Sequence, residues 1–314
     1  MMTFRSHRCC LSICSGLGAG IADFSITDPH GTPRALMRRA APNETNSSNL
    51  ASFFMAPWAN RIRDGTFSFN NTAHTLRPTS ADGMAQHGDV RKRPWRQTQS
   101  AANSAVLEID SRDFADANWP WPFACRAIYT LLGTERGGSL RIDLLVRNLG
   151  DGPMPAGCGH HPYFMRRLWD AGDDLSIRVP AAARYPVQAG CAVGPPAEDD
   201  LTRRLRAGGP VPSEPVDAVF IADSTAPNVA ELHWPASRVR MRIRASANLS
   251  HWVVFAPHES ADRPSPREFI ALEPQTQVND ALNLAATGVF GTGTIVLNPR
   301  EELATTCMFE VEAE

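Results

Sequence analysis

The sequence predicts an all-β protein, a large β-sandwich or barrel built from antiparallel strands. Its clearest periodic segments alternate between apolar and polar residues, as half-buried strands do. No long segment has the periodicity of a helix, and 22 glycines and 25 prolines divide the 314 residues into short pieces. No composition shift or internal repeat marks a boundary, so we expect one domain over residues 1–314.

Three segments carry the alternation most clearly. They are "LRIDLLV" at Leu140–Val146, "RVRMRIRA" at Arg238–Ala245 and "CMFEVEAE" at Cys307–Glu314. Each is expected to form a strand with one face on the core and one in water. The second segment places four arginines on one side, where they would either hold an anion or form an ordinary solvated face; we assign no role to Arg238, Arg240, Arg242 and Arg244.

The composition excludes several classes of protein. Hydrophobic residues make up 43% and charged residues 20%, which is typical of a globular chain with a sizeable core. A net charge of −2 gives no broad basic field, so nucleic acid is not an expected partner. The seven cysteines are odd in number and include no CxxC pair, so we expect reduced thiols and no structural metal.

Two uncharged stretches could in principle be a signal sequence or a membrane span. Residues 1–24 have arginines before an uncharged run, but the run is rich in Cys, Ser and Gly and makes a poor signal sequence. Ala281–Pro299 is long enough to consider as a membrane span, yet its Gly, Asn and Thr residues favour a pair of strands broken by turns. We therefore expect a soluble cytoplasmic protein with no membrane partner.

The stretch "GCGHHPYF" at Gly157–Phe164 is the first candidate site. Histidine has the unperturbed pKa closest to neutrality, so a fixed imidazole at His160 or His161 is a candidate acid or base. The alternative is an ordinary histidine in a turn or in the core, at a strand start punctuated by Gly and Pro.

A carboxyl group supplies the second candidate. Glu273 follows the apolar run 269–272, and a carboxylate at the end of a buried strand must be paired or have a raised pKa. A raised pKa suits a general acid or base working near neutral pH. The competing interpretation is an ion pair with an arginine such as Arg61, which would itself either bind hydroxyl groups or fork to a carboxylate.

Three further stretches place polar residues in apolar or turn-rich surroundings. Asn60 and Arg61 stand in "APWANRIRDG", His87 precedes a glycine in "AQHGDV", and Asp217 lies among small and apolar residues in "EPVDAVF". Taken alone, His87 is better interpreted as a surface or turn histidine than as a binding residue.

Together these stretches, in this order, resemble the aldose 1-epimerase (galactose mutarotase) family. The matching segments run from "SGLGAGIADF" through "WANRIRDGTF", "QHGDVRKRPW", "NLGDGPMPAGCGHHPYF" and "PVDAVF" to "ALEPQTQVNDALN", nearly the whole chain. The resemblance implies the galactose mutarotase-like fold, a large antiparallel β-sandwich with a sugar cleft. The element before Asn60 departs from the family's usual Gly-Arg-Tyr-Ala, which indicates a divergent branch.

The resemblance also implies roles for the candidate residues. The catalytic pair would be His161 as general acid, starting as imidazolium, and Glu273 as general base, starting as carboxylate. Asn60, Arg61, His87 and Asp217 would hold the hydroxyl groups of a small-molecule sugar. The implied reaction interconverts the α and β anomers of an aldose and needs no cofactor and no metal. His160 has no assigned role.

Some questions stay open at this level. Tyr163, Phe164 and Trp95 are candidates for an aromatic wall against the sugar, with core packing the better interpretation for Phe164. A hexose 6-phosphate mutarotase would need extra cations, which Arg91–Arg93 or Arg166 and Arg167 would supply. The other rival is a sugar-binding protein that uses the same cleft without turnover.

Overall fold

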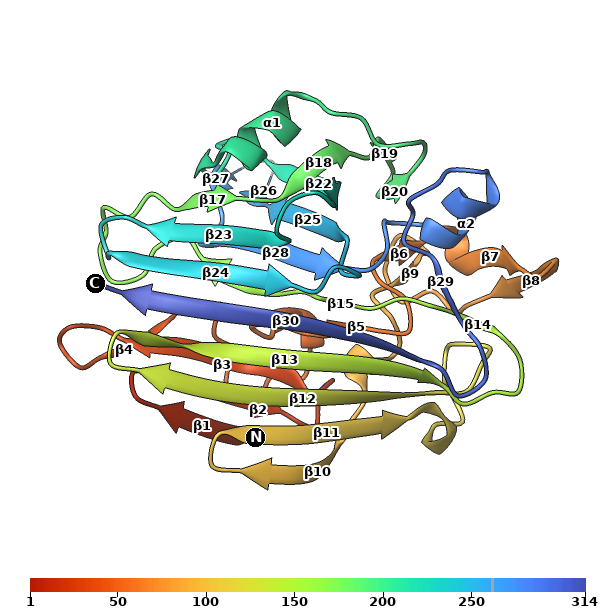
Figure 1. The fold of residues 1–314 in the computed structure, drawn as a ribbon, viewed down its shortest axis with the longest axis horizontal. Helices are drawn as coiled ribbons and strands as arrows, with labels where there is room; N and C mark the ends of the chain where they lie inside the picture. Colours follow the sequence, from red (N-terminus) through yellow and green to blue (C-terminus); the bar gives the residue numbers. More distant parts are fainter. Residues whose placement is uncertain (261–262) are drawn as a thin grey trace.

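The computed structural model describes residues 1–260 and 263–314, and within them strands dominate (Figure 1). The largest sheet has nine strands, and each pairs antiparallel with its neighbours. In spatial order its strands are β10 (Arg96–Ala101), β11 (Ser104–Asp110), β12 (Phe123–Thr134), β13 (Gly137–Asn148), β30 (Glu302–Ala313), β24 (Val239–Ala245), β23 (Val229–Trp234), β17 (Ser176–Arg178) and β21 (Gly209–Pro210).

A seven-stranded sheet forms the second layer. Its strands are β18 (Ala181–Arg184), β22 (Val216–Ala222), β25 (His251–Ala256), β28 (Phe269–Gln275), β15 (Gly159–His160) and β5 (Phe54–Met55), with β16 (Tyr163–Met165) also paired to β28. Strand β28 follows β16 by more than a hundred residues, yet the two strands are paired, so segments far apart in sequence are neighbours in this sheet.

Smaller sheets complete the architecture. A four-stranded sheet holds the N-terminal residues, in the order β1 (Met2–Ser6), β2 (Cys9–Cys14), β3 (Gly20–Thr27) and β4 (Pro33–Ala35). Five two-stranded pairs are β6 (Arg61–Ile62) with β9 (Ala85–Gln86), β7 (Thr66–Phe69) with β8 (Thr72–Thr75), β14 (Met154–Ala156) with β29 (Ile295–Leu297), β19 (Val187–Gln188) with β20 (Cys191–Ala192), and β26 (His258–Ser260) with β27 (Arg263–Pro266).

The core lies between the sheets and follows the predicted alternation. In β13, Leu140, Ile142, Leu144 and Val146 are buried, and in β30 Cys307, Phe309 and Val311 are buried. These side chains share one apolar cluster with Leu272 of the seven-stranded sheet, so the two layers pack face to face. The prediction of an all-β sandwich is confirmed, and β24 begins at Val239, one residue later than expected.

Two short helices were not predicted. Helix α1 (Asp200–Ala207) forms where a loop was expected. The carboxylate of Asp199 accepts a hydrogen bond from the Thr202 backbone N–H at 2.8 Å and so caps the first turn of this helix. Helix α2 (Ala281–Ala286) lies in the stretch expected to form two strands, where only β29 is a strand, so that prediction was wrong in its first half. Within the described ranges, no helix has the length and apolarity to cross a bilayer.

Candidate active site

A hollow of about 180 Å³ lies against the seven-stranded sheet. All six residues predicted to form the site line it, although they come from five separate stretches of the chain. They are Asn60, Arg61, His87, His161, Asp217 and Glu273.

Two neighbouring rows of cross-strand partners form one wall of this pocket. In the first row Val253 of β25 lies opposite Glu273 of β28. Gly159 lies opposite Gln275 and Tyr163 opposite Ala271, so the same register places position 161 opposite Glu273 across the gap that Pro162 makes. In the second row Asp217, Phe255, Ala271 and Tyr163 lie side by side.

These rows face away from the nine-stranded sheet. Successive residues of a strand point to opposite faces, and the neighbours of Glu273 and Ala271 in β28, Ile270 and Leu272, belong to the core between the two layers. Glu273 is therefore inside β28, two residues before its end, and on the pocket face of the strand.

His161 and Glu273 form a direct buried pair. The His161 Nε2 atom lies 3.1 Å from Glu273 Oε1, and only 7% and 3% of the two side chains are exposed. The imidazole packs between two aromatic rings, with centroids 4.5 Å from Phe53 and 4.6 Å from Tyr163. The sequence left open whether Glu273 pairs with Arg61; in the structure its partner is His161.

Burial governs the protonation of this pair. It lowers the pKa of His161 well below 6.5, with the positive charge of Arg91 acting in the same direction. It also raises the pKa of Glu273 well above 4.5, and the charge of Asp217 adds to this. Both shifts favour uncharged groups, a neutral imidazole at His161 and a protonated carboxyl at Glu273. The expected starting state, imidazolium with carboxylate, differs from this by the transfer of one proton along the hydrogen bond.

Left-handed backbone conformations shape the opposite wall. Asn60 has φ of 55° and His87 has φ of 61°, and the two are tied by a 2.7 Å hydrogen bond from the His87 N–H to the Asn60 carbonyl oxygen. Gly88 follows with φ of 70° and lies so close to Ala56 that a Cβ atom would stand 2.1 Å from the Ala56 carbonyl oxygen. The glycine after His87 is thus required where the chain turns into the pocket.

The His87 ring is buried, and burial together with the neighbouring His161 lowers its pKa well below 6.5. Its Nδ1 atom lies 3.0 Å from the sulfur of Met55, and its ring meets that of His161 edge to face at 5.2 Å. His87 is therefore a neutral wall of the pocket, contacting the ring of the predicted acid.

Arg61 and Asp217 lie near the mouth of the pocket. The Arg61 Nη1 atom donates to Asp82 Oδ2 at 2.6 Å, so the guanidinium is oriented by a carboxylate while its remaining donors stay available. Asp217 is exposed to solvent.

Several lining residues were missed or misplaced by sequence reasoning. Phe53 packs beside His161, whereas Trp95 lies in the core, donates to the Val90 carbonyl oxygen and is not part of the pocket. Tyr163 lines the pocket and Phe164 is core, as expected. Asn279 was also missed; its Nδ2 donates to the Gly190 carbonyl oxygen, and its buried Oδ1 has no hydrogen-bond partner among the described residues. Its place in "QVND", a polar residue after buried Val278, was the available signal.

The neighbour of the predicted acid points elsewhere. His160 is wholly buried, and its ring meets Phe54 of the main core edge to face at 5.4 Å. Burial lowers the pKa of His160 to about 4, so the side chain is neutral. It does not line the pocket.

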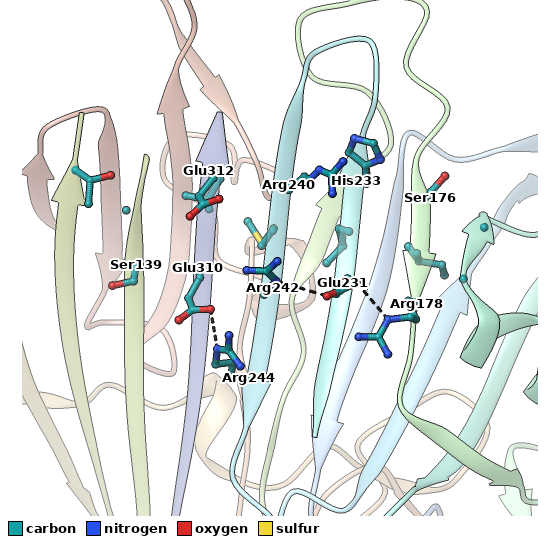
Figure 2. A pocket seen from close by; sticks show the side chains of 18 of the residues that line it. Ser139, Ser176, Arg178, Glu231, His233, Arg240, Arg242, Arg244, Glu310 and Glu312 are labelled. Carbon is teal, nitrogen blue, oxygen red and sulfur yellow. Dashed lines mark hydrogen bonds and ion pairs between the residues drawn. The ribbon is translucent and has the colours of Figure 1, made fainter. Parts of the chain in front are cut away.

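A larger hollow of about 650 Å³ lies on the outer face of the nine-stranded sheet (Figure 2). Side chains from neighbouring strands stand into it, and their charges are largely matched: Glu231 pairs with Arg178 and Arg242, and Glu310 pairs with Arg244. Because of these pairs, we interpret the arginine row of β24 as an ordinary solvated strand face and not as an anion-binding site.

The fold and the pocket define the class of protein. The structure is similar to that of the GalM/aldose epimerase homologue from C. elegans, with a TM-score of 0.81 and 16% identity, covering 100% of this chain and 99% of that one. It is also similar to a galactose mutarotase-like protein from Clostridium acetobutylicum, with a TM-score of 0.79 and 18% identity, covering 99% and 95% of the two chains. The fold is therefore the galactose mutarotase-like β-sandwich.

A family model described as aldose 1-epimerase matches residues 2–310. The chain belongs to the aldose 1-epimerase family. A relative, the protein YihR of Escherichia coli K12, is 26% identical over 174 residues, which are 54% of this chain and 52% of YihR. The chain thus spans about half the length of that relative.

Proposed function

We propose that this protein is a mutarotase that interconverts the α and β anomers of an aldose by opening and closing the sugar ring. The observation that carries the proposal is the buried contact of 3.1 Å between His161 and Glu273 at the pocket wall. In a pyranose the C1 hydroxyl oxygen and the ring oxygen are bonded to the same carbon. An acid and a base that serve these two atoms can therefore lie side by side in one part of the pocket, as this pair does.

The reaction then needs two coupled proton transfers. Glu273 as carboxylate takes the proton of the C1 hydroxyl while His161 as imidazolium gives a proton to the ring oxygen, so the C1–O5 bond breaks and C1 becomes an aldehyde. Rotation about the C1–C2 bond turns the other face of the aldehyde toward O5, and closure reverses both transfers. Each group is expected to contribute about 10²–10⁴-fold to the rate.

The surrounding residues would hold the sugar for this step. The free donors of Arg61, the amide of Asn60 and the carboxylate of Asp217 face the pocket from different sides, which suits recognition of several ring hydroxyls. The unpartnered Oδ1 of Asn279 adds an acceptor. A hollow of about 180 Å³ suits a single sugar ring, since pockets for drug-sized ligands are about 300–1,000 Å³.

Polarimetry tests the proposal. Freshly dissolved α-anomers of glucose, galactose, arabinose and their phosphates are followed with and without the protein, and the proposal expects the decay of optical rotation to accelerate for at least one sugar. A sugar-binding protein without turnover would bind sugar in calorimetry and leave every decay at the buffer rate, which would overturn the proposal.

A further inference from the structure

One end of the pocket carries a positive charge, that of Arg91, which no carboxylate of the described residues neutralises. Arg91 lines the pocket, and the residue is only 5% exposed. Its Nη1 atom donates to Ser48 Oγ at 3.0 Å, and its guanidinium lies 5.1 Å from the centre of the Phe53 ring. Within residues 1–260 and 263–314, no carboxylate forms an ion pair with Arg91.

A second guanidinium lies close to the same end. Arg38 stacks on the Tyr163 ring at 3.9 Å and donates to the backbone carbonyl oxygens of Ser48 and Leu50. In the described part of the chain it has no ion pair either, and its Nε is buried without a hydrogen-bond partner. Ser48 therefore accepts hydrogen bonds from both guanidinium groups, and Tyr163 contacts that of Arg38. The positive charges of Arg91 and Arg38 both lower the pKa of the nearby His161.

The other cations that sequence analysis offered are arranged differently. Arg93 is held by two carboxylates, Asp89 at 2.8 Å and Asp116 at 2.8 Å. Lys92 is exposed, and neither it nor Arg166 lines the pocket. Among these cations, Arg91 is therefore the one that lines the pocket and has no ion pair within the described residues.

An unmatched buried arginine is costly, because the guanidinium stays charged at any physiological pH and loses its hydration on burial. Of its five N–H donors, Arg91 uses one on Ser48. A carboxylate or phosphate oxygen pair matches the fork of the remaining donors, so a ligand that brings such a group would satisfy the charge.

The position of Arg91 indicates where on the sugar that group sits. Arg91 and His161 pack against the same ring, that of Phe53, at 5.1 Å and 4.5 Å from its centre, and His161 is the residue proposed to protonate the ring oxygen O5. The atoms bonded to O5 are C1, where the chemistry occurs, and C5, which carries C6. We infer that the preferred substrate is an aldose with an anionic group at C6, a carboxylate or a phosphate ester, bound by Arg91 with Arg38 behind it. This inference rests on the proposed function and specifies its substrate class.

Exchange NMR tests the inference, because it measures anomer interconversion at equilibrium. The probes are glucose, glucuronate and glucose 6-phosphate, and the quantity compared is kcat/KM for each anionic sugar divided by that for glucose. We expect at least one anionic sugar to exceed glucose by tenfold or more; which one does so distinguishes a uronate from a phosphate ester. A ratio of one or less for both anionic sugars would overturn the inference.

Two variants sharpen this test. Arg91→Gln is expected to reduce the anionic-to-neutral ratio by tenfold or more, whereas Lys92→Gln, which removes the same charge one residue away outside the pocket, is expected to keep it. An Arg91→Gln variant that folds and retains the ratio contradicts the inference, while Arg91→Lys should restore part of it.

The outcomes separate this inference from the proposed function. Acceleration of glucose alone would support mutarotation and reject the anionic substrate. Acceleration of none of the sugars, with glucuronate or glucose 6-phosphate bound in calorimetry and released by Arg91→Gln, would reject mutarotation and support the anion site.

Discussion

Glu273 lies opposite His161 in the antiparallel register of β28 with the segment that joins β15 to β16. Backbone pairing on both sides of Pro162 therefore fixes the distance between the two side chains. Because the ladder holds the pair, changes at either side chain should affect the chemistry far more than the fold.

The first prediction concerns these two residues. His161→Gln and Glu273→Gln should each lower kcat for anomerisation by about 10²–10⁴-fold, because each removes one proton-transfer group with little change of volume. The double variant should be little worse than either single variant, since the two groups act as a unit. Polarimetry measures the rates, and circular dichroism checks the fold. The matched control is His233→Gln in the larger hollow on the outer face of the nine-stranded sheet, which should keep full activity. Full activity in both single variants would refute the assignment.

The second prediction concerns pH. The pair holds one proton in its working state, whichever member carries it. The lowered pKa of His161 means that a second proton is added only below pH 6.5, and the raised pKa of Glu273 means that the last proton is lost only well above pH 4.5. A plot of kcat/KM against pH should therefore have its acid limb well below pH 6.5 and its alkaline limb well above pH 4.5. A profile that rises through pH 6–7 as an ordinary histidine titrates would contradict the buried pair.

The third prediction tests how Arg61 is oriented. Asp82→Asn removes the charge that holds the Arg61 guanidinium at 2.6 Å. Asp82 is partly exposed, and such ion pairs contribute roughly 0.2–1 kcal/mol, so KM should rise by about two- to fivefold while kcat changes little. Steady-state kinetics with the best substrate measures both constants. Asp151→Asn, which makes the same charge change at an exposed site, should leave both as they are; a fall in kcat alone for Asp82→Asn would rule out a positioning role.

The fourth prediction compares two glycines with similar backbone angles. Gly88 has φ of 70° and Gly31 has φ of 83°, but only at Gly88 would a Cβ atom meet backbone, whereas Gly31 faces open space. Gly31→Ala should cost about 1–2 kcal/mol of unfolding free energy through the left-handed angle alone. Gly88→Ala should cost about 1–3 kcal/mol more from overpacking and should also lower activity by displacing His87. Equal losses in denaturant titrations would show that the close approach to Ala56 is not maintained.

The sequence was most informative where a residue's environment follows from local pattern. Alternation predicted β13 and the C-terminal strand because side-chain direction in a strand has a period of two. The polar residues of the pocket stand out in apolar or turn-rich surroundings, but their roles, and the choice of His161 over His160, came from the resemblance to the aldose 1-epimerase family. Helix α2 was misread because a six-residue helix that buries Ala281, Leu282 and Leu284 has no amphipathic period to detect.

Other features depend on relations between distant segments. Whether Phe53 or Trp95 faces the pocket depends on the register of the two-residue strand β5, which has no sequence signature of its own. Arg91 has no ion pair among the described residues, whereas Asp89 and Asp116 form ion pairs with Arg93. Which arginine these carboxylates pair with cannot be read from the sequence. The protonation of His161 and Glu273 depends on burial that only the assembled pocket provides.

The last prediction concerns the two adjacent histidines. His160 and His161 differ by one position and so point to opposite sides of the sheet, one into the core and one into the pocket. Neither ring nitrogen of His160 has a hydrogen-bond partner among the described residues, and a buried polar group left in that state costs about 1–3 kcal/mol. His160→Leu removes the polar atoms at similar volume, so the free energy of unfolding should stay the same or increase. Anomerisation should remain within about twofold of the unmodified protein, because the His160 side chain does not line the pocket, in contrast to the about 10²-fold or greater loss for His161→Gln. Loss of activity in a stably folded His160→Leu protein would instead assign His160 a part in setting the protonation of its neighbour.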